Sequence, residues 1–114
     1  MSIRNDLLVK IAQAYGVTVH PLKSRNFILN AILIQIGGVA TGSTRSQLLI
    51  DILLQLGGTL TNAESRNSIL RDIVITVGGG TLNGKSRNFL LEQWLLTIES
   101  GGGEFTNEFT SEFS

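Results

Sequence analysis

A Ser-Arg-Asn motif, or a close variant of it, returns every 20 or 21 residues along this chain of 114 residues. The five repeated arginines are Arg4, Arg25, Arg45, Arg66 and Arg87. A fixed period of this length indicates one small supersecondary unit that is copied about five times and stacked on itself. Because such chains usually present a surface or build an assembly, the period favours binding over catalysis.

The spacing of apolar residues after each arginine predicts a helix in every repeat. Aliphatic residues stand three and four positions later, and large apolar residues stand seven and eleven positions later. In the second repeat these are Ile28, Leu29, Ile32 and Ile36. Spacings of three, four, seven and eleven place side chains on one stripe of an α-helix.

The predicted helix ends agree with this pattern. A hydroxyl residue precedes four of the arginines, at Ser24, Thr44, Ser65 and Ser86, where it can accept a hydrogen bond from an unpaired backbone N–H. Glycines follow at 37–38, 57–58 and 78–80, where a left-handed residue can close a helix. We therefore expect helices of about 12 residues, about 18 Å long at 1.5 Å per residue.

The fold predicted for residues 2–100 is all-α: tandem helix-plus-loop repeats of 20–21 residues, stacked as a small solenoid. The connectors of seven or eight residues are long enough to return the chain along its helix, which permits parallel helices, and antiparallel stacking stays open. An α/β solenoid with a short strand in each repeat is the alternative, because Ile32, Ile34 and Ile36 also alternate.

The first and last repeats differ from the inner ones in ways typical of the caps of an open stack. In the first repeat, Ala12-Gln13-Ala14 replaces the larger aliphatic residues that later repeats have eight and nine positions after the arginine, and Glu99-Ser100 takes the usual glycine positions. We expect one side of the first helix to face water, and the inner helices to be covered by neighbours on both sides.

Composition excludes several classes of site. The chain has no cysteine, so it has no disulfide framework and no thiolate metal site. His20 is the only histidine and cannot build a metal or catalytic cluster alone. Charges balance at nine basic and nine acidic residues, and no apolar run approaches the length of a membrane span. We expect a soluble chain without a signal peptide, catalytic residues, a cofactor or a small-molecule substrate.

The composition changes at residues 101–114, which we interpret as a glycine hinge and a C-terminal arm. Each of Phe105, Phe109 and Phe113 directly follows a glutamate, and their four-residue spacing would place them on one face of a helix. One hypothesis is that these phenylalanines bind a protein partner or a neighbouring subunit. The arm packing back on its own solenoid, or staying disordered, are the alternatives.

The repeated arginines and asparagines have two interpretations. A column of arginines could contact phosphates, but the neutral charge and the lack of adjacent aromatic residues argue against nucleic-acid binding. We expect a structural role, with each arginine bonding loop carbonyls of the adjacent repeat and the asparagines bonding between repeats. These asparagines are Asn5, Asn26, Asn67 and Asn88, with Ser46 in the third repeat. Gly84-Lys85-Ser86 matches the last three residues of a phosphate-binding loop, but the glycine spacing and the strand that precede them in such a loop are missing. We therefore do not interpret these three residues as a phosphate site.

The unit S-R-N-x-L-L-x-x-I-L-x-x-x-G-G with a threonine-rich connector resembles short tandem repeats in structural proteins of tailed bacteriophages. The resemblance covers nearly all of the chain outside the arm. It implies a virion component assembled in the host cytoplasm, such as a head, neck or tail accessory protein, that self-associates or binds other virion proteins. It transfers no functional site. A monomeric helical-repeat adaptor that binds a protein partner is the alternative.

Overall fold

The computed structural model describes residues 3–61, 65–80 and 85–100. These contain five helices: α1 (Ile3–Ala14), α2 (Arg25–Gln35), α3 (Arg45–Gln55), α4 (Arg66–Thr76) and α5 (Arg87–Glu99). The all-α repeat fold is confirmed, and the strand-containing alternative is wrong for the described residues, which hold no strand. Among them no helix has the length and hydropathy to cross a bilayer. The C-terminal arm, with Phe105, Phe109 and Phe113, lies outside the described residues.

The N-terminal ends of four helices are capped as the sequence predicted. Ser24, Thr44, Ser65 and Ser86 are the N-caps of α2 to α5, and each has extended backbone. Each side-chain oxygen accepts a hydrogen bond from the backbone N–H three residues later, at 3.1–3.2 Å. The caps therefore satisfy one otherwise unpaired donor per helix and fix where each repeat begins.

Glycine ends the first four helices with the same hydrogen-bond pattern. After α2, the N–H of Gly37 donates to the carbonyl of Ile34, and the N–H of Gly38 donates to that of Leu33. This pair of bonds is a Schellman motif, which requires a left-handed residue at its first position. Gly16, Gly37, Gly57 and Gly78 hold that position with φ of 101°, 94°, 91° and 108°.

The helices share one direction. The repeated arginine is the first residue of α2 to α5 and the second of α1, and all five arginines line one small cavity. The N-terminal ends of the helices therefore meet at one end of the molecule. Each connector must return the chain from the C-terminal end of one helix to the N-terminal end of the next, so the helices are parallel.

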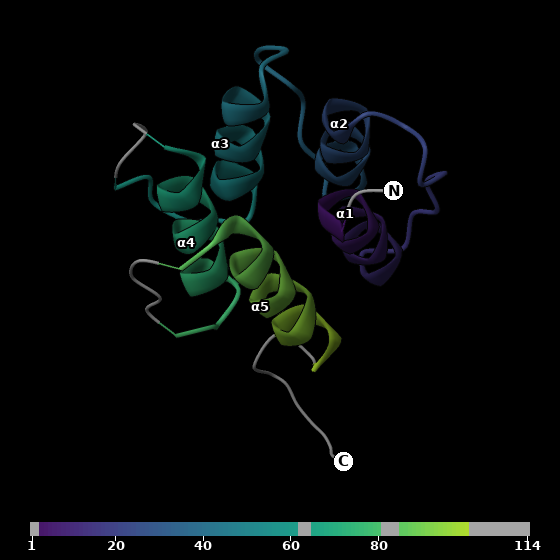
Figure 1. Cartoon of the computed structure of the whole chain (residues 1–114). Helices are drawn as coiled ribbons and strands as arrows, with labels where there is room; N and C mark the ends of the chain where they lie inside the picture. Colours follow the sequence, from purple (N-terminus) through teal and green to yellow (C-terminus); the bar gives the residue numbers. More distant parts are fainter. Residues whose placement is uncertain (1–2, 62–64, 81–84, 101–114) are drawn as a thin grey trace.

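The five helices form a closed ring. Figure 1 shows them following one another around the molecule in chain order, and α1 packs directly against α5 as well as α2. The expectation that the terminal repeats cap an open stack is therefore wrong. Ala12 is fully buried, although its replacement of a larger aliphatic residue suggested a water-facing side.

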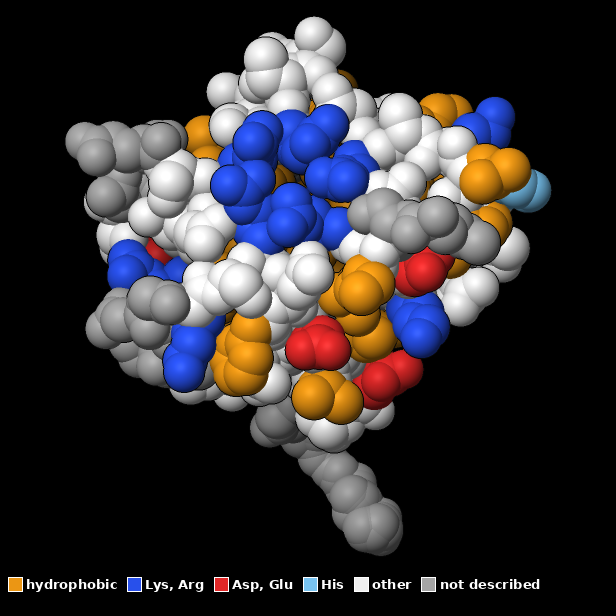
Figure 2. All heavy atoms as spheres, in the orientation of Figure 1, with side chains coloured by type: hydrophobic (Ala, Val, Ile, Leu, Met, Phe, Trp, Pro, Cys, Tyr) orange, Lys and Arg blue, Asp and Glu red, His pale blue; other side chains and the backbone are white. Residues whose placement is uncertain are grey.

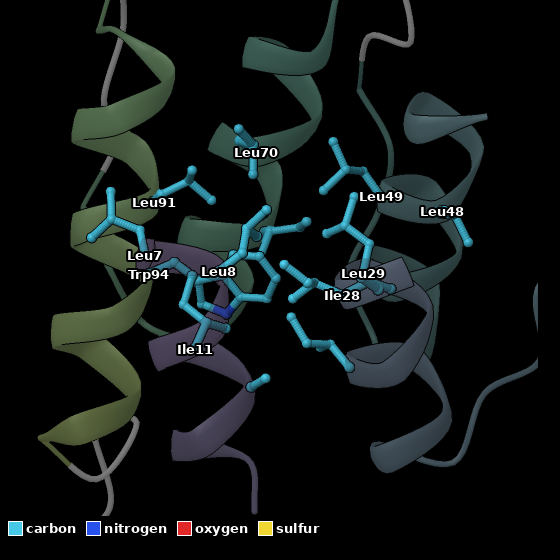
Figure 3. Close-up of a cluster of buried hydrophobic side chains, with 14 of the residues drawn as sticks. Leu7, Leu8, Ile11, Ile28, Leu29, Leu48, Leu49, Leu70, Leu91 and Trp94 are labelled. Carbon is cyan, nitrogen blue, oxygen red and sulfur yellow. The ribbon is translucent and has the colours of Figure 1, made fainter. Parts of the chain in front are cut away.

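The interior of the ring is built in layers from equivalent positions of the repeats. Figure 3 shows labelled side chains from different helices, among them Leu8, Leu29 and Trp94, directed into one common interior. One layer lies four residues after each arginine, and the next lies seven residues after it. The second layer contains four isoleucines and Trp94, all fully buried.

Trp94 and Tyr15 join the last repeat to the first. The indole Nε1–H of Trp94 donates to the hydroxyl of Tyr15 at 3.0 Å, and the two rings meet edge to face with centroids 6.3 Å apart. Burial raises the pKa of Tyr15, while the hydrogen bond from Trp94 lowers it, with burial the larger effect. The contact gives the buried indole the partner it needs where the ring closes.

The left-handed glycines give a test of the repeat boundaries. Gly57→Ala should lower the free energy of unfolding by about 1–2 kcal/mol, because its φ of 91° is strained for any residue with a Cβ, although nothing lies within 4 Å of that Cβ. Gly80→Ala is the matched control: it has equally open space and no left-handed φ. Urea unfolding should show the control to be neutral or slightly stabilised. Equal effects of the two substitutions would refute the assignment of Gly57 as the left-handed residue that ends α3.

Candidate functional site

The five repeated arginines form a ring at the N-terminal end of the helices. We call Arg4, Arg25, Arg45, Arg66 and Arg87 the arginine ring. With Leu8, Leu29, Leu49, Leu70 and Leu91 they line a cavity of about 20 Å³. Figure 2 shows Lys and Arg side chains gathered into one patch on this face of the molecule. The parallel helices and the fixed position of arginine in each repeat together produce this cluster.

An asparagine orients most of the arginines. Asn5 Oδ1 accepts a hydrogen bond from Nε of Arg25 at 2.8 Å, and its Nδ2 donates to the carbonyl of Lys23 at 3.1 Å. The equivalent Arg-to-Asn distances are 3.1 Å for Arg45 to Asn26 and 2.7 Å for Arg87 to Asn67. Each asparagine therefore holds both the arginine and the loop of the following repeat.

The same contact closes the ring. Arg4 Nε donates to Asn88 Oδ1 at 3.0 Å, which connects residues 84 positions apart. We expected the arginines to bond loop carbonyls directly; in the structure their Nε atoms bond asparagine, and the asparagines Asn5, Asn26 and Asn67 bond the carbonyls. The exception is the third repeat, where Ser46 replaces asparagine and Arg66 has no hydrogen bond to a described residue.

The ring concentrates positive charge. Burial lowers the pKa of Arg45, and the charges of the other four arginines lower it further. The pKa of Arg87 is lowered by burial and then by Arg66 and Arg4. Two unit charges about 8 Å apart repel by roughly 0.5 kcal/mol in bulk water and roughly 2 kcal/mol at an effective dielectric constant of about 20. Arginine stays protonated in proteins, so this repulsion persists in the folded ring.

The chemistry available at the ring is recognition of anions. None of the ten residues that line the cavity carries a carboxylate, a thiol, an imidazole or a hydroxyl, so the lining contains no nucleophile or general base. Among the described residues, no group of three or more His, Cys, Asp or Glu is placed to hold a metal ion. Guanidinium groups bind carboxylate and phosphate oxygens through paired N–H donors.

Two buried carboxylates elsewhere have structural partners. Asp51 accepts hydrogen bonds from the backbone N–H and hydroxyl of Thr41 at 2.8 and 2.9 Å, and Asp72 accepts the same pair from Thr61. Burial raises the pKa of Asp51, but the hydrogen bonds from Thr41 and Gln47 outweigh it, so that this pKa lies below its ordinary value. These carboxylates attach the connectors to their helices. Each binds the connector that precedes its own helix.

A second surface feature is a belt of exposed aliphatic residues. Ile34, Leu54, Ile75 and Leu96 stand nine residues after the arginine in α2 to α5, with 61%, 56%, 43% and 57% of their surface exposed. We call these four residues the aliphatic belt. The sequence suggested that neighbouring helices cover this position. Closure of the ring instead turns it outward, and only α1 has a polar residue there, Gln13.

Comparison of the chain with known protein families, curated proteins and solved structures finds no match. The resemblance to phage repeats therefore stays a prediction.

His20 is exposed, and its Nδ1 accepts a hydrogen bond from the backbone N–H of Leu22 in the first connector.

The asparagine bridges give a second test. Asn67→Ala should lower the free energy of unfolding by about 1–3 kcal/mol, because it leaves Arg87 Nε and the Lys85 carbonyl without their partner. Ser46→Ala, at the same position in the third repeat, should change stability by less than about 0.5 kcal/mol. Ser46→Asn should stabilise the fold by about 0.5–1.5 kcal/mol by giving Arg66 an acceptor. Thermal unfolding checks all three, and a destabilised Ser46→Asn would count against the bridge.

Proposed function

We propose that this protein is a non-catalytic structural module that assembles through its outer surface, either with further copies of itself or with another protein. The aliphatic belt supports the proposal most strongly. In the closed ring α1 and α5 pack against each other, so neither terminal helix has a free flank against which a further helix could stack. A partner must therefore bind the outer surface of the ring or one of the two ends of its axis.

The belt is more than scattered exposure. Single exposed aliphatic residues are normal on soluble proteins. Here four of them occupy the same position on four consecutive helices, and packed helices lie only about 8–10 Å apart. Their side chains therefore recur around the outer surface at the spacing of the helices, and such a repeated set of exposed aliphatic residues favours a protein interface.

The setting that we propose for this assembly is the virion of a tailed bacteriophage, in a head, neck or tail accessory position. The repeat motif and its coverage of the chain support this. The runner-up is a monomeric adaptor that binds a different protein through the same belt. In both cases the arm with Phe105, Phe109 and Phe113 is a proposed second contact with the partner.

The oligomeric state tests the proposal. Light scattering on a sizing column should give a defined multiple of the 12.3 kDa chain mass. Leu54→Gln with Ile75→Gln should shift that mass to the monomer, because the pair removes apolar contact area from the centre of the belt. Leu22→Gln is the control, since Leu22 is 75% exposed but lies in a connector outside the belt.

A wild-type monomer at high concentration would exclude self-association and leave either the adaptor or a virion protein that assembles only on its partner. An oligomer that survives the belt double variant would show that the belt is not the interface.

A further inference from the structure

We propose that the arginine ring is a binding site for one compact polyphosphate group, held near the ring axis by guanidinium groups from all five repeats. The inference goes beyond the structural function proposed above, because it concerns the N-terminal end of the ring and not the belt. It rests on the convergence of charge, the orientation of the donors and the shape of the cavity.

The first argument is charge. Five arginines line one cavity, and no carboxylate is among the described residues that line it with them. The positive charge of each of the other four arginines, together with the larger effect of burial, lowers the pKa of Arg45. A ligand with several negative charges on adjacent oxygens relieves this repulsion far better than a single carboxylate or a chloride ion.

The second argument is orientation. The Nε atoms of Arg4, Arg45 and Arg87 are committed to asparagine, which fixes the plane of each guanidinium group. Their terminal Nη atoms donate to none of the residues that the structure describes. A guanidinium fixed through Nε presents its remaining N–H groups in a geometry that suits phosphate oxygens. The ring is therefore preorganised for an oxyanion, which lowers the entropic cost of binding.

The third argument is shape. Below the arginines the cavity is lined by five leucines and measures about 20 Å³, which is room for about one water molecule. An anion therefore cannot descend past the guanidinium groups and must stay in the plane of the ring. This geometry favours a compact ligand on the axis over a nucleic-acid strand, whose phosphates are spread along a track.

Isothermal titration at constant ionic strength tests the site, with sodium tripolyphosphate as the probe. We expect saturable binding of one anion per chain, and no saturable heat from sodium chloride. Arg66→Gln should weaken binding by at least about tenfold, because it removes one charged donor. Arg66 is the best position to change, since it has no hydrogen bond to a described residue that its loss would break. Lys10→Gln is the matched control: it removes one exposed positive charge outside the ring and should change affinity less than about twofold.

Melting temperature gives a readout that a purely structural role of Arg66 would not produce. Without the anion, Arg66→Gln should melt at the same or a higher temperature than the wild type, because it relieves repulsion. With tripolyphosphate, the wild type should gain several degrees and Arg66→Gln clearly less. This measurement on the wild type also holds if the variant fails to fold.

A nucleoside triphosphate should bind as tightly as tripolyphosphate, because the lining offers only arginine and leucine. Tighter binding of the nucleoside triphosphate would indicate that the polyphosphate group recognised by the ring belongs to a nucleotide. The proposal is overturned if tripolyphosphate neither binds saturably nor raises the melting temperature, or if Arg66→Gln and Lys10→Gln bind it equally. An oligothymidylate that binds more tightly per phosphate would also overturn it, in favour of single-stranded nucleic acid.

Discussion

Each helix of this protein must bury its inner stripe and both of its flanks, and that requirement determines the rest of the structure. In a linear stack of five, the two end helices would each expose one apolar flank. Closure adds a fifth interface between α1 and α5 and covers both flanks at once. Burying one large aliphatic side chain is worth about 1.5–3 kcal/mol, so an additional interface is a large gain for a domain of this size. The ring is therefore favoured over an open solenoid.

Closure in parallel orientation has an electrostatic consequence. Every repeat starts with an arginine, so five positive charges meet at one end of the ring. Hydrogen bonds between arginine and asparagine of neighbouring repeats offset part of the repulsion and carry the register around the ring, including the junction between Arg4 and Asn88. Gln35 and Gln55 make comparable contacts at the other end, to the carbonyls of Tyr15 and Ile36. Polar contacts thus connect neighbouring repeats at four junctions at the N-terminal end and at two junctions at the C-terminal end, and aliphatic packing connects them in the middle.

Local features of the fold could be predicted from the sequence, because local interactions decide them. Serine or threonine before each arginine and glycine after each apolar stripe determine where α2 to α4 begin and end. Closure could not be predicted this way, because a first repeat with smaller residues suits an open end as well as a junction. One signal was present. Trp94 and Tyr15 are the aromatic exceptions at otherwise aliphatic positions, they belong to the last and first repeats, and they contact each other where the ring closes.

The candidate sites depended on the same global feature. The aliphatic residue nine positions after the repeated arginine was expected to pack against a neighbouring helix. In the closed ring this residue points outward in α2 to α5. The arginines and asparagines were expected to connect repeats, but convergence of all five arginines on one cavity follows only when parallel helices close around an axis. Periodicity gives the face of the helix on which a residue lies, and the curvature of the stack decides what that face meets.

The distance between α1 and α5 in solution tests the closed ring most directly. The chain has no cysteine, so Lys10→Cys with Glu92→Cys carries two spin labels at defined, exposed positions on these helices. Double electron–electron resonance should give one short distance, below about 25 Å, because neighbouring helices lie about 8–10 Å apart. An open stack would separate the two helices by four such spacings, about 32–40 Å, and a distance distribution centred there would contradict the ring.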